Sequence, residues 1–98
     1  MRKDEITMEK RAMELMNTFE MMTSSDYKER FKAEYYQTKI RYEKLKAFNT
    51  KIEAAMLSEK VEMLKHDCPE TILRKQQSVM GEYLHILELR AVIEGIEL

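Results

Sequence analysis

The sequence has little of what interrupts helices or cross-links chains. Its 98 residues include two glycines, one proline, one cysteine and no tryptophan. Long helices can therefore run without a break, and the single Cys68 excludes a framework of internal disulfides. No apolar run approaches the length of a membrane span, and the first residues, MRKDEITMEK, lack the apolar stretch of a signal peptide. We expect a protein of a reducing cytosol that does not engage a membrane.

Charge of both signs is abundant and nearly balanced. Charged residues make up 36% of the chain and hydrophobic residues 44%, with a formal net charge of -1. Generic DNA binders depend on a basic surface, so we expect no binding of duplex DNA, and a strongly acidic mimic of nucleic acid is equally excluded. The length allows one domain at most. The richness in Glu, Lys, Leu, Met and Ala indicates an all-α fold.

The stretch from Cys68 to Arg90 predicts a helix with an unusually wide apolar band. One row of residues alternates intervals of three and four, which places them on one helical face. Its members are Leu73, Gln76, Met80, Tyr83, Leu87 and Arg90. A second row beside it consists of Ile72, Val79, Ile86 and Ile93. We expect this helix to touch more than one neighbour, and its polar members to mark specific contacts or a wet edge.

The whole chain, 1–98, is interpreted as a single helical domain. A leading helix with a methionine-rich apolar stripe is expected over 3–22, and a long helix over 26–57. Residues 58–68 form the reversal, in which the part before the proline is compatible with either helix or turn. A final helix is expected over 69–94.

The expected helix ends carry recognisable signals. Asp26 is suited to cap the long helix. Asp67 and Glu70 fit a capping box around Pro69, and Gly95 fits a helix stop. The long and final helices should form an antiparallel hairpin. Because two wide apolar bands cannot cover each other completely, we expect hairpins to assemble into a homo-oligomer.

A search for catalytic chemistry finds no convincing site. Gly81 and Gly95 stand alone, so there is no glycine-rich phosphate loop. His66, Asp67 and Cys68 are adjacent in the sequence, so their side chains cannot easily converge on one metal ion. We therefore expect no catalytic residues, no metal site and no cofactor, and interpret the protein as a non-enzyme.

Aromatic and basic residues alternate along the long helix. They are Tyr35, Tyr36, Lys39, Arg41, Tyr42, Lys44, Lys46, Phe48 and Lys51. Aromatic faces stack on nucleobases and cations neutralise phosphates, and Tyr83 and Arg90 offer another ring and guanidinium on the final helix. The alternative is that the tyrosines belong to the core and the cations are simply solvated.

Two segments, YYQTKIRYEKLKAF and ILRKQQSVMGEYLHILELR, resemble a known family. They are similar to small phage proteins that sequester cyclic nucleotides, the anti-CBASS cyclic-oligonucleotide sponges and related small phage helical-hairpin proteins. The shared positions are Arg41, Leu45 and Phe48, then Gln76, Met80, Tyr83, Leu87 and Arg90. The resemblance covers the chain from about Tyr35 onward and leaves out the leading helix.

The resemblance implies a helical hairpin in a homo-oligomer that binds cyclic di- or trinucleotides between protomers without cleaving them, in the host cytoplasm. The family's base-stacking tyrosine falls on Tyr35, and its basic residue after the phenylalanine falls on Thr50, with Lys51 next to it. Binding residues expected from the resemblance and the sequence together are Tyr35, Tyr36, Arg41, Tyr42, Lys51, Arg74, Tyr83 and Arg90. The alternative function is a phage protein-interaction module that inhibits a host defence protein, such as a CRISPR effector, and a third is a structural helical protein without a ligand.

Overall fold

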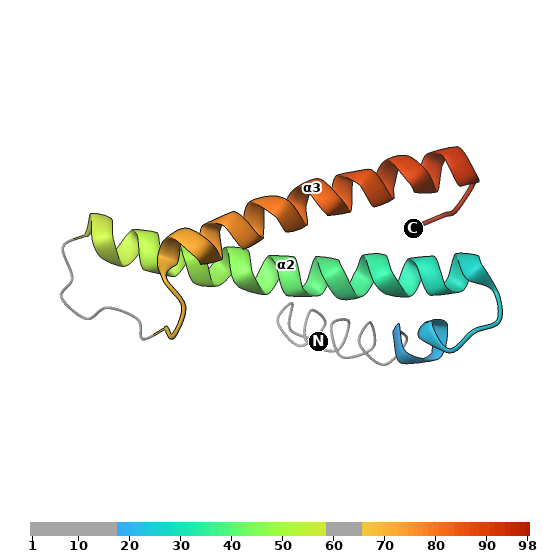
Figure 1. The fold of residues 1–98 in the computed structure, drawn as a ribbon, viewed down its shortest axis with the longest axis horizontal. Helices are drawn as coiled ribbons and strands as arrows, with labels where there is room; N and C mark the ends of the chain where they lie inside the picture. Colours follow the sequence, from blue (N-terminus) through green and yellow to red (C-terminus); the bar gives the residue numbers. More distant parts are fainter. Residues whose placement is uncertain (1–17, 59–65) are drawn as a thin grey trace, which may run out of the picture.

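The computed structural model describes residues 18–58 and 66–98, and in these ranges all regular structure is helical. Helix α2 spans Tyr27–Leu57 and helix α3 spans Glu70–Glu94 (Figure 1). A short helical segment, residues 18–22, precedes α2. The all-α prediction is therefore confirmed, and no described residue lies in a β-strand.

The expected long helix and the observed α2 differ by one residue at the start. Asp26 is the N-cap, and its carboxylate accepts a hydrogen bond from the Lys28 backbone N–H at 3.0 Å. Such a bond satisfies one of the free donors at a helix start. At the other end, the Ser58 N–H donates to the carbonyl of Ala54. Most of the expected leading helix and the middle of the expected reversal lie outside the described residues.

The two ends of α3 differ in how well the sequence predicts them. The predicted capping box is wrong, because Pro69 is the N-cap and no side chain caps the helix. Glu70 instead pairs with Arg74 at 2.5 Å. The predicted stop is confirmed, because Gly95 is left-handed with φ 71° and ψ 35°. The turn brings the buried Ile96 back onto the hairpin, and the Ile96 N–H donates to Ala91 O at 2.8 Å.

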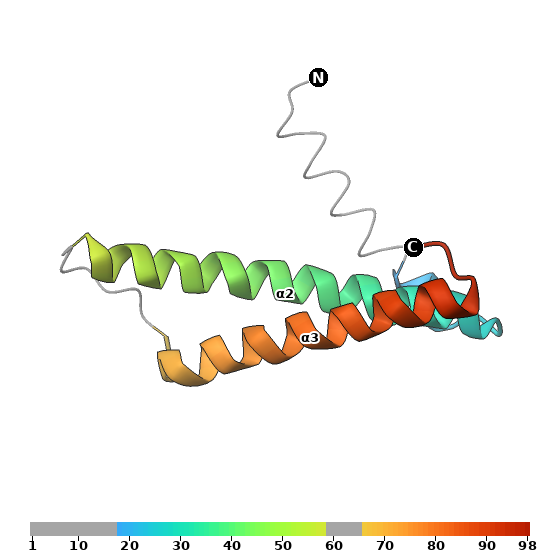
Figure 2. The ribbon, with the colours of Figure 1, turned by 90° about the horizontal axis from the view of Figure 1, so that it is seen from above.

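Helices α2 and α3 lie side by side and run in opposite directions (Figure 1; Figure 2). The first half of α2 therefore meets the last half of α3, and the core lies there. Its buried members are Phe31, Tyr35, Leu84, Leu87, Ala91 and Ile96, with Tyr36 and Tyr42 packed against them. Gly81 admits the Tyr42 ring, since a Cβ at Gly81 would lie 3.3 Å from Tyr42 Cε1.

A polar contact joins the helices toward their other ends. The Asn49 amide donates to Leu73 O at 3.2 Å and to Gln77 Oε1 at 2.9 Å. Asn49 is only 5% exposed, and its Oδ1 has no hydrogen-bond partner among the described residues. A buried amide of this kind fixes the alignment of two helices at some cost in stability.

The face that α3 turns toward α2 differs from the predicted row. Leu87 is buried as expected, and the exposed Gln76 and Arg90 agree with the predicted wet edge. Tyr83 is exposed as well, and the other buried positions are Leu84 and Ala91, which lie outside the predicted row. The second predicted row faces away from α2. Its exposed fractions are Ile72 52%, Val79 54%, Ile86 51% and Ile93 81%. An aliphatic row therefore runs the length of α3 without a partner among the described residues.

Candidate functional site

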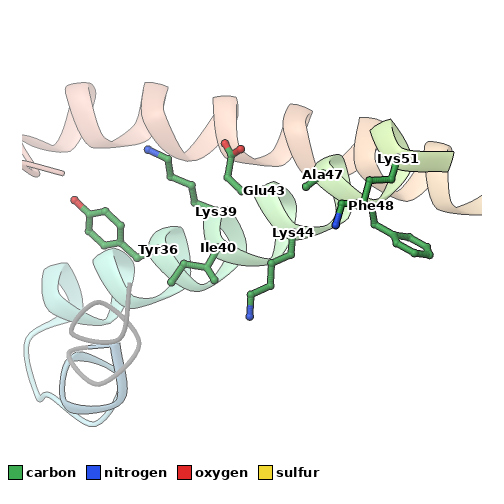
Figure 3. Close-up of a pocket in the computed structure, with 8 residues that line it drawn as sticks. All are labelled: Tyr36, Lys39, Ile40, Glu43, Lys44, Ala47, Phe48 and Lys51. Atoms are coloured by element: carbon green, nitrogen blue, oxygen red, sulfur yellow. The ribbon is translucent and has the colours of Figure 1, made fainter. Parts of the chain in front are cut away.

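A hollow of about 540 Å³ runs along α2 (Figure 3). The described residues that line it are Tyr36, Lys39, Ile40, Glu43, Lys44, Ala47, Phe48 and Lys51, and we call it the α2 groove. Figure 3 shows that all eight come from α2, with Tyr36 near one end and Phe48 near the other. Its volume lies within the range of about 300–1,000 Å³ of small-molecule sites.

Helical spacing explains why these side chains share a face. Successive lining residues are alternately three positions and one position apart, so that each residue has partners three or four positions away on the same side of the α-helix. Ile40 is nine positions after the core residue Phe31, and at about 100° per residue this puts it on the opposite side of the helix. The α2 groove therefore lies on the side of α2 that α3 does not cover.

The α2 groove combines positive charge with flat apolar surface. Its described lining residues include three lysines, Lys39, Lys44 and Lys51, and one carboxylate, Glu43. None of these four forms an ion pair with another residue in the described parts of the chain. Aromatic faces such as Tyr36 and Phe48 stack on bases, while lysines neutralise phosphates. The groove is suited to an anionic ligand that also has flat rings.

The aromatic residue at each end of the α2 groove contacts a second ring outside the groove. The Tyr36 and Tyr35 rings meet edge to face, with centroids 5.3 Å apart and an interplanar angle of 77°. The Phe48 and His66 rings meet in the same way at 6.2 Å and 84°. His66 precedes α3, so both ends of the groove have contacts outside the groove-lining face.

A smaller hollow of about 330 Å³ adjoins the α2 groove. It lies where residues 18–22 approach α2, and it is lined by Thr18, Phe19, Met22, Gln37, Ile40, Arg41 and Lys44. Ile40 and Lys44 line both hollows. Phe19 is 68% exposed, so this hollow also presents an accessible aromatic ring beside basic side chains.

The structure distributes the predicted residues of α2 over three places. Tyr36 and Lys51 line the α2 groove, and Arg41 lines the smaller hollow. Tyr42 is half-buried against Gly81 between the helices. Tyr35 is 5% exposed, and its hydroxyl donates to Glu88 Oε2 at 2.7 Å. The pKa of Tyr35 is raised to about 12, mainly by burial and secondly by this hydrogen bond.

The predicted residues of α3 are engaged with carboxylates. The Tyr83 hydroxyl donates to Glu34, and this bond is the main cause that raises the pKa of Tyr83. Arg90 Nε donates to Glu94 Oε2 at 2.7 Å, which raises the pKa of Arg90 and lowers that of Glu94.

The Arg90 guanidinium also lies 4.9 Å from the centre of the Phe31 ring. Arg74 pairs with Glu70. The structure therefore does not bring Arg74, Tyr83 or Arg90 to the α2 groove, and each has an intramolecular partner.

Several groove-lining residues were missing from the predicted binding set. Lys39, Lys44 and Phe48 belong to the aromatic and basic run along the long helix, whereas Ile40, Glu43 and Ala47 were not predicted to belong to a binding site. A usable signal is the spacing from Tyr36 through Ile40 and Ala47 to Lys51, which follows the face opposite the hairpin seam.

The described ranges contain neither a metal-binding cluster nor a helix that could span a membrane. No group of three or more His, Cys, Asp and Glu side chains there is placed to hold a metal ion. Neither α2 nor α3 contains a stretch apolar enough to cross a lipid bilayer.

Comparison with known proteins gives one match. No curated protein and no solved structure matches the chain. The Sequestin family model matches residues 25–93, which include all of α2 and nearly all of α3 and hence every lining residue of the α2 groove. This match confirms the resemblance to the cyclic-oligonucleotide sponges. Because the matched range covers most of the sequence, the chain belongs to the Sequestin family.

Proposed function

We propose that this protein sequesters a cyclic oligonucleotide signal in the α2 groove and releases it unchanged, as a phage counter-defence protein in the host cytoplasm. The observation that carries the proposal is the lining of the groove, in which two aromatic rings accompany an excess of lysines. Bases stack on Tyr36 and Phe48, and the phosphates meet Lys44 and Lys51. The family name is compatible with sequestration.

The charge of the ligand matches that of the groove. Each phosphodiester of a cyclic oligonucleotide carries one negative charge, and the groove has three lysines and one glutamate. Opposite charges within a few ångströms attract by several kcal/mol when solvent is partly excluded. A ligand with two or three phosphates therefore suits this lining better than a neutral molecule.

We also propose that the protein acts as a homo-oligomer whose copies meet along α3. The aliphatic row Ile72, Val79, Ile86 and Ile93 repeats every seven residues, and each member is at least half exposed. A seven-residue repeat of β-branched side chains is typical of helices that pair lengthwise. Taking such a side chain from full exposure to full burial contributes about 1.5–3 kcal/mol. Three of the four are already about half covered, so each of these adds about half of that, and a shared row still favours association.

Sedimentation velocity at micromolar concentration tests the assembly. Ile86→Glu places a charge in the row and should produce monomers. Val92→Glu is the matched control, because Val92 is an exposed aliphatic residue of α3 outside the row. A monomeric wild-type protein, or equal effects of the two substitutions, would contradict this interface.

Calorimetry against cyclic di-AMP, cyclic di-GMP, cyclic GMP–AMP and cyclic tri-AMP tests the ligand. Lys44→Glu reverses a charge in the α2 groove and should weaken binding by about tenfold or more. Lys46→Glu makes the same charge change on the same helix outside the groove, and should have little effect. Mass spectrometry should recover the nucleotide intact. A folded protein that binds none of the four would refute the proposal.

The second candidate function is inhibition of a host defence protein by direct binding. It is favoured by Phe19 and Met22, which are 68% and 49% exposed beside the smaller hollow. This candidate predicts a stoichiometric complex with one host protein that Phe19→Ser disrupts. Nucleotide binding in the absence of any such complex would contradict it.

A further inference from the structure

One buried ring contacts two of the side chains that line the α2 groove. Tyr35 meets the Tyr36 ring edge to face at 5.3 Å. The Lys39 Nζ lies over the Tyr35 ring, 5.8 Å from its centre. Tyr36 and Lys39 are the aromatic and the cationic residue at the same end of the groove. Both side chains therefore contact a residue that does not itself line the groove.

Tyr35 is held in place from the other side of α2. It is 5% exposed and belongs to the core formed with Leu84, Leu87 and Ala91 of α3. Its hydroxyl donates to Glu88 of α3 at 2.7 Å. A ring with this much packing and an anchored hydroxyl has one orientation, so it can fix the side chains that rest on it.

We propose that Tyr35 is a positioning residue whose ring orients Tyr36 and Lys39 at the end of the α2 groove, with Glu88 anchoring that ring to α3. This role rests on the proposed function in that the groove is taken as the ligand site. It assigns base stacking to Tyr36, not to Tyr35, because the Tyr35 ring is enclosed between the helices.

Phe31, another buried aromatic residue of the same core, provides a matched control. Phe31 is equally buried, at 5%, and sits in the same core. It stacks with Arg90 and does not line the groove. Phe31→Leu and Tyr35→Leu therefore each remove one buried ring from one cluster, but only the second removes the support of Tyr36 and Lys39.

The test is carbon-13 NMR of the full-length protein without ligand, observing the tyrosine rings and the lysine ε-methylene groups. The wild-type protein should show ring-current shifts for Tyr36 and Lys39, and cross-relaxation of both with Tyr35. Tyr35→Leu removes the source of both shifts, so the deciding readout is the three-bond couplings that report the χ1 rotamers of Tyr36 and Lys39, which should become averaged in this variant. Tyr35→Phe, which keeps the ring, should retain the wild-type couplings, and so should Phe31→Leu.

The proposal is overturned if Tyr35→Leu, still helical by circular dichroism, keeps the wild-type χ1 couplings of Tyr36 and Lys39, or if Phe31→Leu averages them equally. If Tyr35→Leu does not fold, the wild-type spectra decide, since absence of cross-relaxation between Tyr35 and both neighbours overturns the proposal. These measurements need no nucleotide, so they remain decisive even if calorimetry refutes the proposed function.

Discussion

Replacing Tyr35 by phenylalanine removes one hydroxyl from a buried ring and takes away the donor to Glu88. The bond is 2.7 Å long and its acceptor is a carboxylate. Hydrogen bonds to charged groups contribute about 1.5–3 kcal/mol. The Glu88 side chain is 51% exposed and regains water in the variant, so the loss should be near the lower end, about 1–2 kcal/mol.

The control is Tyr83→Phe, which deletes the reciprocal bond from α3 to Glu34 of α2. Tyr83 is 39% exposed, and exposed interactions with a charged group contribute little, about 0.5 kcal/mol or less. Each kcal/mol lowers the melting temperature of a domain this size by about 4–8 °C. Thermal unfolding should therefore show a clear drop for Tyr35→Phe and a small one for Tyr83→Phe.

The pH dependence of this difference follows from the raised pKa of Tyr35. That hydroxyl ionises near pH 10.0 in the unfolded chain and near pH 12 in the folded protein. Its contribution to stability is therefore complete below pH 10 and is lost as the pH rises from 10 to about 12.

Urea unfolding should give a gap between wild type and Tyr35→Phe that narrows across this window. Equal destabilisation by Tyr35→Phe and Tyr83→Phe, or a gap that stays constant from pH 10 to 12, would contradict a stabilising hydrogen bond from the buried Tyr35 hydroxyl to Glu88.

Two further substitutions test the hairpin. Gly95→Ala should lower the free energy of unfolding by about 1–2 kcal/mol, because φ is 71° and the added Cβ would contact no atom, which leaves only backbone strain. Gly95→Asn should lower it by less, because asparagine tolerates a positive φ better than alanine. Equal losses in urea unfolding would contradict backbone strain as the cause. Asn49→Leu gives up hydrogen bonds to Leu73 and Gln77 but removes an unpartnered buried oxygen, so we expect unchanged stability or a gain of about 1 kcal/mol. A loss above about 1 kcal/mol would show that the amide pair is net stabilising.

The extents of the helices follow from local signals in the sequence. Asp26 supplies a capping carboxylate and Gly95 a residue that tolerates a positive φ, and the structure uses both. These effects act within one turn, so nearby residues are enough to predict them. The box of Asp67 and Glu70 fails because Glu70 pairs with Arg74 and Pro69 takes the N-cap position.

The face of α3 is harder to predict because the helix has two apolar rows. Leu87 lies in the row that packs on α2, while Ile86 next to it lies in the exposed row. Periodicity identifies both rows but does not say which one α2 covers. The choice is made by contacts between helices, such as Tyr42 against Gly81 and Asn49 with Gln77.

The candidate site was only partly predictable for a related reason. The sequence singles out the aromatic and basic run of the long helix, and Tyr36 and Lys51 do line the α2 groove. Tyr35 and Tyr36 are adjacent residues of the same type, so the sequence does not distinguish them. They point about 100° apart around the helix, and this places Tyr35 in the core. Arg74 and Arg90 looked available, but carboxylates one turn away neutralise them.

The most direct test of the central claim is an NMR titration of nitrogen-15-labelled protein with the nucleotide that binds most tightly. We expect the largest chemical-shift changes to follow the face of α2 from Tyr36 through Lys44 to Lys51, around the groove. Changes confined to the exposed row of α3, or the absence of any change at saturating nucleotide, would contradict the claim that this groove holds the ligand.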